Sequence, residues 1–299
     1  MEALSTYIAF CRPHTIVSTL LVPIVVTIVY SMRYDVDVKF IMNMVLATDA
    51  FFKANVAIVG INQIYDVEVD RINKKYLPLA SGAMSMATAW FIVVSHTVIG
   101  LSIAIIYCTE YFIKMYILLL LIGLTYSVPP LRTRNSALLA SLSITLCRGI
   151  ILPSTMNLHA RNSLHLSDEW YFEGPLLYLI LFNTMWALAI SVFKDIPDIE
   201  GDSKNGIGSL AVKLGVSEAF DICVLWCTGV LILSIAYSIV VPSKDVSKIT
   251  TSLTNMIILA LFVTKSTRTN VKNPDATTKL YRMMWKILYS EYILSIFII

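Results

Sequence analysis

The chain has 299 residues, of which 57% are hydrophobic and 14% are charged, and its mean hydropathy is +0.73. Soluble domains carry roughly a quarter charged residues, so this composition excludes an ordinary soluble protein and is typical of a polytopic membrane protein. The net charge of +3 is small and gives no indication of nucleic-acid binding.

Nine apolar stretches follow one another along the chain, each close to the length that crosses a bilayer as a helix. They are continuous and far longer than the roughly ten residues of a membrane strand, and a helix satisfies its own backbone hydrogen bonds in lipid. We therefore expect an all-α polytopic membrane protein with nine transmembrane helices, at residues 15–32, 40–61, 86–107, 112–128, 136–156, 174–193, 219–241, 249–264 and 283–299.

The loops differ in charge. Most of the 23 Lys and Arg lie in the N-terminal segment and in the loops after the second, fourth, sixth and eighth spans, which places that side toward the cytoplasm or its equivalent. The opening residues lack the Arg- and Ser-rich character of a transit peptide, so we expect internal targeting or a mature form. The five cysteines are scattered, and we interpret them as packing residues rather than metal ligands or disulfides.

Two similar polar motifs follow the second and sixth spans. The first is NQIYDVEVDRINK, starting at Asn62, and the second is FKDIPDIEGDSKN, ending at Asn205. The repeat predicts two pseudo-repeated four-helix units plus one extra helix. Such repeats commonly bring equivalent half-sites together near the centre of a membrane bundle.

Carboxylates form a stripe in each motif if the preceding helix continues through it. Asn62, Asp66 and Asp70 are spaced four residues apart on one helix face. Facing carboxylate stripes repel unless a cation neutralises them, and Mg²⁺ binds through a few carboxylates plus substrate phosphate. A solvated helix end explains one stripe alone, but two matched stripes favour the metal. The second stripe consists of Asp195, Asp198 and Asp202.

Basic residues surround both stripes. Arg suits phosphate oxygens and Lys supplies a mobile charge, although a topological preference for positive loops explains Arg132 and Arg134 nearly as well. Acidic and basic groups above an apolar bundle indicate a metal–diphosphate site for a ligand with an apolar tail, a prenyl diphosphate. The surrounding residues are Arg71, Lys74, Lys75, Lys194 and Lys204, with Tyr126, Arg132 and Arg134 in YSVPPLRTR.

The two motifs resemble those of a known family. NQxxDxxxD at Asn62–Asp70 and KDxxDxxGD at Lys194–Asp202 are similar to the two signatures of the UbiA superfamily of intramembrane prenyltransferases. FCRPHT, RINKKYLPLASG, YSVPPLR and SKNGIGSLAVKLG resemble the plant branch that contains homogentisate and flavonoid prenyltransferases, and Asn62-Gln63 argues against the chlorophyll synthase branch. The resemblance covers essentially the whole chain and implies one prenyltransferase domain, residues 1–299, with nine helices around a central cavity.

The resemblance also implies roles for individual residues. It implies Mg²⁺ as cofactor, with catalytic carboxylates at Asp66, Asp70, Asp198 and Asp202, supported by Asn62 and Asp195 as further metal ligands. Diphosphate contacts are implied at Arg71, Lys74, Arg132, Lys194 and Lys204. The resemblance implies acceptor or cavity positions at Asn55 and Arg148, and we add Tyr65 and Tyr126 as cavity positions because they are placed near the mouth of the bundle.

Several residues depart from this pattern or stand apart from it. Asp49 and Lys53 lie inside the second span, and we interpret them as an intrahelical ion pair rather than a proton relay. Pro153 stands where the branch resemblance leads us to expect Gln, and it can kink the fifth span. We expect His159, at a loop entrance, to be structural, and Glu291 to pack against a polar partner.

The implied reaction transfers a prenyl group to a carbon of an aromatic phenol. We expect a dimethylallyl donor, then geranyl, and a flavonoid or coumarin acceptor, with homogentisate prenylation in tocopherol or plastoquinone synthesis as the alternative. A non-catalytic prenyl-lipid carrier is the rival of another class, but loss of one carboxylate stripe would be its mark and both are intact. The partners are then a prenyl diphosphate, a phenol and membrane lipid, and the resemblance implies a plastid membrane with the motif loops facing the stroma.

Overall fold

The computed structural model describes residues 2–166, 171–172, 174–240 and 245–298, and the regular elements in these ranges are helices. This confirms the all-α prediction. By contacts the chain divides into two compact units, Met1–Arg134 with Ile151–Trp170, and Asn135–Ile150 with Tyr171–Ile299. The division falls inside the expected fifth span.

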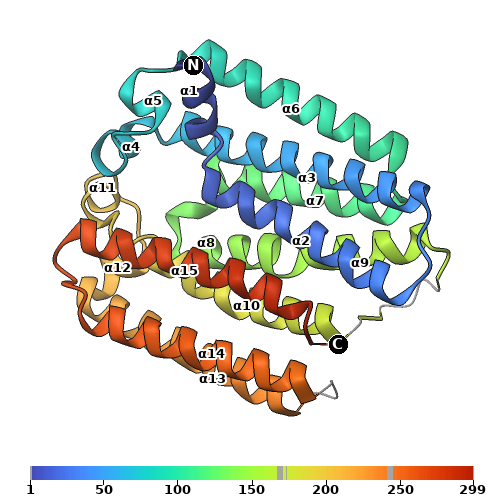
Figure 1. Cartoon of the computed structure of the whole chain (residues 1–299). Coiled ribbons are helices and arrows are strands. Elements are labelled where there is room, and N and C mark those ends of the chain that lie inside the picture. Colours follow the sequence, from blue (N-terminus) through green and yellow to red (C-terminus); the bar gives the residue numbers. More distant parts are fainter. Residues whose placement is uncertain (1, 167–170, 173, 241–244, 299) are drawn as a thin grey trace. The chain divides into compact units, whose positions relative to one another are not determined.

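The first unit is built around the long helix α3 (Val38–Tyr65), which packs against α2, α6, α7 and α9 (Figure 1). Short helices at the ends of α2 and α3 complete it. Its helices are α1 (Glu2–Phe10), α2 (Pro13–Arg33), α3, α4 (Val67–Asn73), α5 (Pro78–Ser81), α6 (Met86–Tyr107), α7 (Glu110–Ser127) and α9 (Leu152–Ser163).

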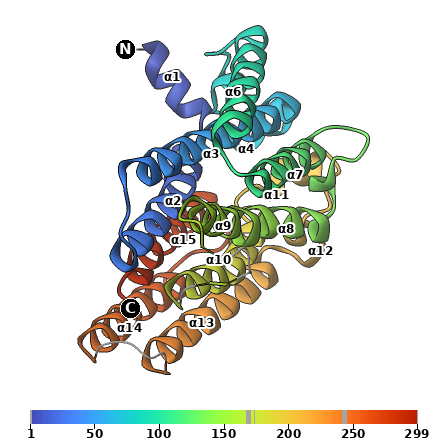
Figure 2. The same ribbon diagram turned by 90° about the vertical axis from the view of Figure 1, so that its right-hand side faces the viewer.

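In the second unit, α10 (Gly174–Phe193) packs against α8, α13 and α15, while α13 and α14 run side by side (Figure 2). Asn135 O accepts a hydrogen bond from Gly208 N at 3.3 Å, which ties the start of this unit to the loop after α11. The remaining elements are η1 (Thr133–Asn135), α8 (Ala137–Thr145), η2 (Leu146–Ile151), α11 (Ile199–Lys204), α12 (Leu210–Leu214), α13 (Val216–Val240), α14 (Asp245–Thr267) and α15 (Pro274–Ser295).

Eight helical segments in the described residues are long and apolar enough to cross a membrane, and they correspond to the first eight expected spans. The expected ends at 241 and 299 lie outside the described residues. The ninth expected span, 283–299, falls on α15, which begins earlier, at Pro274, and is not among the eight. Its charged residues lower its hydropathy, so the count of nine is not confirmed.

The fifth span is a helix of three parts, because a π-helical turn, η2, separates α8 from α9. Pro153 sits at the start of α9. A proline lacks the N–H of a helical bond and crowds the carbonyl four residues earlier, and the wider π turn directly before it accommodates both effects. The expectation of a loop from residue 157 is wrong: α9 continues to Ser163, and His159 is buried in it rather than at a loop entrance.

A small apolar cluster holds the end of the first unit that carries the NQIYDVEVD motif. Its buried members include Phe10 of α1, Leu79 of α5 and Val93 of α6, and Ile64 and Val67 of the motif pack on it. Gly60 permits this close approach, because a Cβ there would lie 2.6 Å from a Val93 methyl group and 2.9 Å from the Phe10 ring. Small residues at helix contacts are typical of membrane bundles.

Candidate active site

The first motif forms a bend in an almost continuous helical path. Helix α3 ends at Tyr65, Asp66 leaves the helical region with φ −109° and ψ 12°, and α4 begins at Val67. The backbone bonds continue through the bend, since Asp66 N donates to Asn62 O at 3.0 Å and Asp70 N donates to Asp66 O at 2.8 Å. The predicted stripe therefore survives, with a bend at its central carboxylate.

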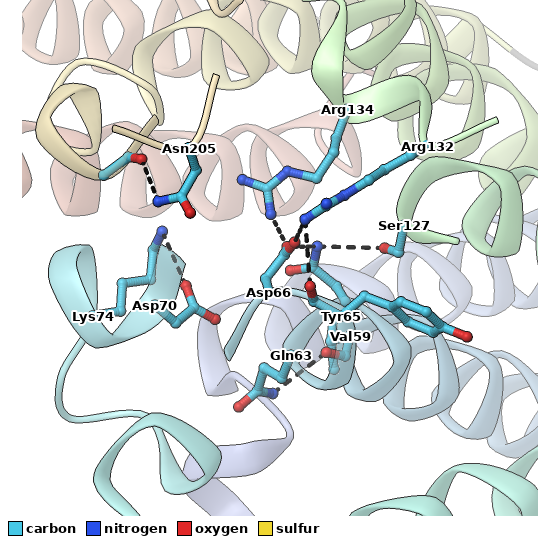
Figure 3. A network of polar contacts seen from close by, with 12 residues as sticks. Val59, Gln63, Tyr65, Asp66, Asp70, Lys74, Ser127, Arg132, Arg134 and Asn205 are labelled. Atoms are coloured by element: carbon cyan, nitrogen blue, oxygen red, sulfur yellow. Dashed lines mark hydrogen bonds and ion pairs between the residues drawn. The ribbon is translucent and has the colours of Figure 1, made fainter. Parts of the chain in front are cut away.

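Asp66 is the centre of a buried charge network (Figure 3). Its side chain is 1% exposed and accepts from Arg132 Nη2 at 2.9 Å, and Arg134 Nη1 pairs with its other oxygen. Asn62 Nδ2 also donates to it, at 2.5 Å. Arg132 reaches further and donates to Tyr65 O at 3.3 Å. Two guanidinium groups thus neutralise one buried carboxylate, as a buried charge requires.

Asp70 lies one turn further on and has its own cations. Arg12 Nη2 lies 3.5 Å from Asp70 Oδ2, and Lys74 Nζ lies 3.9 Å from Asp70 Oδ1. Arg12 has a left-handed backbone, with φ 50°, directly before the first turn of α2. Burial raises the pKa of the neighbouring Cys11 thiol, so that thiol stays neutral and adds no competing negative charge.

Sequence reasoning missed Arg12 as a site residue, although FCRPHT was singled out. The link between the two segments is Gln63 of the NQIYDVEVD motif. Its side chain is buried and donates from Nε2 to Phe10 O at 2.6 Å. This bond holds the chain two residues before Arg12 against the motif. Gln63 is therefore a positioning residue for the N-terminal arginine.

Other predicted residues of the first unit lie at the margin of this network or apart from it. Arg71 is exposed and pairs with Glu68 at 2.7 Å. The Tyr65 ring meets Trp90 edge-on, with centroids 6.3 Å apart. Asn55 is buried within α3, where its Nδ2 donates to Thr15 Oγ1 at 3.0 Å. Tyr126 is half-buried in the last turn of α7, and Lys75 is exposed.

The second motif does not continue the helix that precedes it, which corrects the expectation of a single carboxylate stripe. Helix α10 ends at Phe193, and residues 194–198 form a tight turn in which Asp195 N donates to Val192 O and Ile196 N to Phe193 O. Pro197 is the physical reason, since it lacks an N–H and disfavours the helical conformation of the residue before it. Asp198 is then the N-cap residue of α11, which begins at Ile199.

The second motif nevertheless buries all three of its aspartates. Asp195, Asp198 and Asp202 are 6%, 9% and 2% exposed. Lys194 Nζ lies 2.5 Å from Asp195 Oδ1, whereas Lys204 is exposed and pairs with Glu200 at 2.6 Å.

The C-terminal end of α11 is also held in place. Asn205 Nδ2 donates to Gly201 O at 2.8 Å, which closes this end of the motif.

Arg148 lies on the π-helical turn of the second unit. Its guanidinium carbon is 5.1 Å from the centre of the Trp285 ring, and its carbonyl accepts from Asn183 Nδ2 at 2.7 Å. Among the described residues its buried Nη1 has no hydrogen-bond partner. Glu291, expected to pack against a polar group, is buried and accepts from Tyr178 Oη at 2.5 Å.

The donor atoms of these motifs fit a hard divalent cation. Within the described ranges no group of three or more His, Cys, Asp or Glu side chains forms a complete metal cage. Mg²⁺ is usually bound by one or two carboxylates together with substrate phosphate, so an incomplete cage of buried Asp oxygens suits it. In the first motif Asn62 adds an amide oxygen, Oδ1, with no protein partner among the described residues.

The fold and these motifs define the class of protein. Apolar membrane-length helices end in two motifs that bury aspartates beside basic side chains, an arrangement that fits a membrane enzyme for an anionic substrate with an apolar tail.

The particular family follows from comparison with known proteins. The chain belongs to the UbiA prenyltransferase family, whose model matches residues 20–288. It is 33% identical over 294 residues to a probable homogentisate phytyltransferase 2, chloroplastic, of Oryza sativa subsp. japonica, covering 95% of this chain and 75% of the relative.

Two further similarities bear on its chemistry and fold. The chain is 30% identical over 299 residues to naringenin 8-dimethylallyltransferase 2, chloroplastic, of Sophora flavescens, covering 98% of this chain and 72% of the relative. A UbiA homolog from Archaeoglobus fulgidus, solved bound to DMAPP and Mg²⁺, matches its fold with a TM-score of 0.66 at 17% identity, over 97% of this chain and 99% of that one. The chain is an aromatic prenyltransferase with the UbiA fold.

Proposed function

We propose that this protein transfers a long prenyl group from its diphosphate to a ring carbon of homogentisate, with Mg²⁺ as cofactor. The observation that carries the acceptor is the similarity to homogentisate prenyltransferases along nearly the whole chain. This replaces the flavonoid acceptor expected first from the sequence. A flavonoid and a dimethylallyl donor remain the second candidate, favoured by the similarity to the naringenin enzyme.

In the proposed mechanism the polar residues of each motif serve as ligands of Mg²⁺. Asn62, Asp66 and Asp70 of the first motif, and Asp195, Asp198 and Asp202 of the second, would hold Mg²⁺. When bound, the ion supplies Lewis-acid assistance by withdrawing charge from the departing diphosphate, which is worth several kcal/mol.

The arginines around Asp66 then have a second role. In the free protein, Arg132 and Arg134 neutralise Asp66. When the diphosphate binds, we propose that these guanidinium groups turn toward its oxygens and leave the Asp66 carboxylate available as a ligand. Because Arg and carboxylate are already held together, the site carries no large net charge before substrate arrives. Arg12 and Lys74 serve Asp70 in the same way.

The chemical step breaks the allylic C–O bond, and the electron pair leaves with the diphosphate. The allylic cation formed must be kept from water, which an apolar helix bundle provides. A ring carbon of the phenol attacks the cation, and loss of the proton from that carbon restores aromaticity. The departing diphosphate can accept this proton, so no side chain is needed as the base.

The test is a substrate panel in membranes that contain the protein. Homogentisate and naringenin are each supplied with phytyl, geranylgeranyl, solanesyl or dimethylallyl diphosphate, with Mg²⁺ or with excess EDTA. We expect prenylated homogentisate with one of the long donors, and loss of turnover with EDTA. Prenylated naringenin alone would favour the second candidate, and folded protein with no product from any pair would favour a carrier over an enzyme.

The variants Asp66→Ala and Asp198→Ala test the ligand assignment. Each is expected to abolish turnover while the protein remains in the membrane, and near-full activity in either would overturn it. We further propose, from the chloroplastic relatives, a plastid membrane with the motif loops in the stroma. Residues 1–299 would act as a single prenyltransferase domain.

A further inference from the structure

An ion pair lies inside the membrane-spanning part of α3, away from both motifs. Lys53 Nζ donates to Asp49 Oδ1 at 2.8 Å, which bears out the predicted intrahelical pair. At 1.5 Å per residue, Asp49 lies roughly 16 Å from the start of α3 and roughly 24 Å from its end. The hydrocarbon core of a bilayer is about 30 Å thick, so this carboxylate lies within it.

The two members of the pair differ in exposure. The Lys53 side chain is 17% exposed and that of Asp49 is 41% exposed. The Lys53 stem packs against Gly100 of α6, because a Cβ on that glycine would lie 3.0 Å from Lys53 Cβ. Asp49 Oδ2 has no hydrogen-bond partner among the described residues. A charged oxygen exposed at this depth is costly, which makes Asp49 a candidate functional residue.

Asp49 opens into a groove formed by α2 and α3. The groove has a volume of about 530 Å³, and its walls are mainly apolar, with Ile24 and Ile28 from α2 and Val45 from α3. These three side chains are 47%, 37% and 55% exposed. The volume is within the range of small-molecule sites.

The polar side chains that line the groove, as far as the structure describes it, offer acceptors. Thr27 donates its hydroxyl proton to Pro23 O at 2.8 Å, and Thr48 donates its own to Met44 O at 2.6 Å. Each hydroxyl oxygen therefore faces a ligand only as an acceptor. Asp49 Oδ2 is the third acceptor, and the neighbouring cation, Lys53, is engaged with Asp49 Oδ1.

We propose that this groove binds a lipophilic phenol, an aromatic hydroxyl compound with an isoprenoid or alkyl chain. The phenol O–H donates to Asp49 Oδ2, and the ring and chain lie along the apolar wall. An anionic headgroup is repelled by the carboxylate, and an acyl chain alone leaves all three acceptors without a donor. Binding of a lipophilic phenol in this groove does not depend on catalysis. The identification of that phenol as the prenylated product of the enzyme rests on the proposed function.

Photolabelling of the intact protein in phosphatidylcholine vesicles tests this site. The probe is a para-alkylphenol with a diazirine in its alkyl chain, and its matched control is the methyl ether, which has the same shape without the donor. No Mg²⁺ or prenyl diphosphate is present. We expect the phenol to label peptides of α2 and α3 at least about tenfold more than the ether. A hydrogen bond to a charged group strengthens binding by about this factor.

Three variants sharpen the test. The double variant Asp49→Leu/Lys53→Leu removes the pair without leaving a lone charge, and Val45→Phe fills the groove; both are expected to abolish the difference between phenol and ether. Ile105→Phe adds the same bulk on α6, where Ile105 is 57% exposed, and is expected to leave it unchanged.

The two proposals fail separately. Equal labelling by phenol and ether, or selective labelling that survives both groove variants, would overturn this site whatever the turnover. Selective labelling in a protein that turns over no substrate would overturn the proposed function alone.

Discussion

Replacement of Asp66 by asparagine tests whether Asp66 neutralises Arg132 and Arg134 until the substrate binds. The substitution Asp66→Asn keeps the size of the side chain but removes its charge. The new amide N–H₂ would also face Arg132 and Arg134, which now donate to a carboxylate. Both guanidinium groups would lose Asp66 as an anionic partner, at a position where the Asp66 side chain is 1% exposed.

The magnitude follows from burial. Removal of one partner from a fully buried ion pair costs about 3–5 kcal/mol. Arg132 and Arg134 are 27% and 12% exposed, so water compensates part of the loss and we expect about 2–4 kcal/mol. This corresponds to a melting temperature lower by roughly 5–10 °C. Activity is expected to fall at least about a hundredfold, as for loss of one preorganised electrostatic group.

The assay combines thermal unfolding with turnover of purified protein in detergent. The free cysteines include buried Cys11, Cys223 and Cys227, so a thiol-reactive dye reports unfolding. A second variant, Asp66→Asn/Arg134→Gln, removes one of the two cations that face this position and should recover part of the stability but none of the activity. If Asp66→Asn melts like the natural protein, or if the double variant regains turnover, the assigned role of Asp66 is wrong.

Three further predictions concern the surroundings of the first motif. Gln63→Leu loses the bond to Phe10 O, and should raise the KM for prenyl diphosphate more than it lowers kcat, with a stability loss of about 1–2 kcal/mol. Gly60→Val overpacks the contact beneath the motif and should cost about 1–3 kcal/mol in thermal unfolding. Glu68→Ala breaks an exposed pair with Arg71, so both melting temperature and turnover should stay near the natural values; a large loss of either would place Glu68 in the site.

Much of the fold and the family could be predicted from local features of the sequence. The length and continuity of apolar runs decide which segments become membrane helices, so eight of the expected spans match helical segments within a few residues, except where α9 extends the fifth. The ninth expected span is not confirmed, because the charged residues of α15 keep it out of the apolar segments that are found. The motifs, too, were recognisable from the identity and spacing of their residues, and the family followed from them.

The ends and bends of helices were harder to predict from the sequence, because weak local backbone preferences compete at these positions. Asp66 bends the first motif but leaves its hydrogen bonds in place. The second motif forms a turn between α10 and α11. Pro197 was enough to predict this break, but the regular spacing of the carboxylates favoured a continuous helix. At the fifth span, by contrast, Pro153 was correctly suspected of disturbing the helix, and only the structure showed a π-helical turn as the form of the disturbance.

The sequence alone determined which segments cross the membrane, where the two acidic motifs lie and to which family the chain belongs, because these depend on local composition and spacing. Only the tertiary structure decided which cation serves which carboxylate. Arg134 reaches Asp66 from η1, which follows α7, and Arg12 reaches Asp70 from the N-cap of α2. Such partners are distant in the chain, and their distances are set by helix packing and by single bonds such as that from Gln63 to Phe10, which no local pattern encodes.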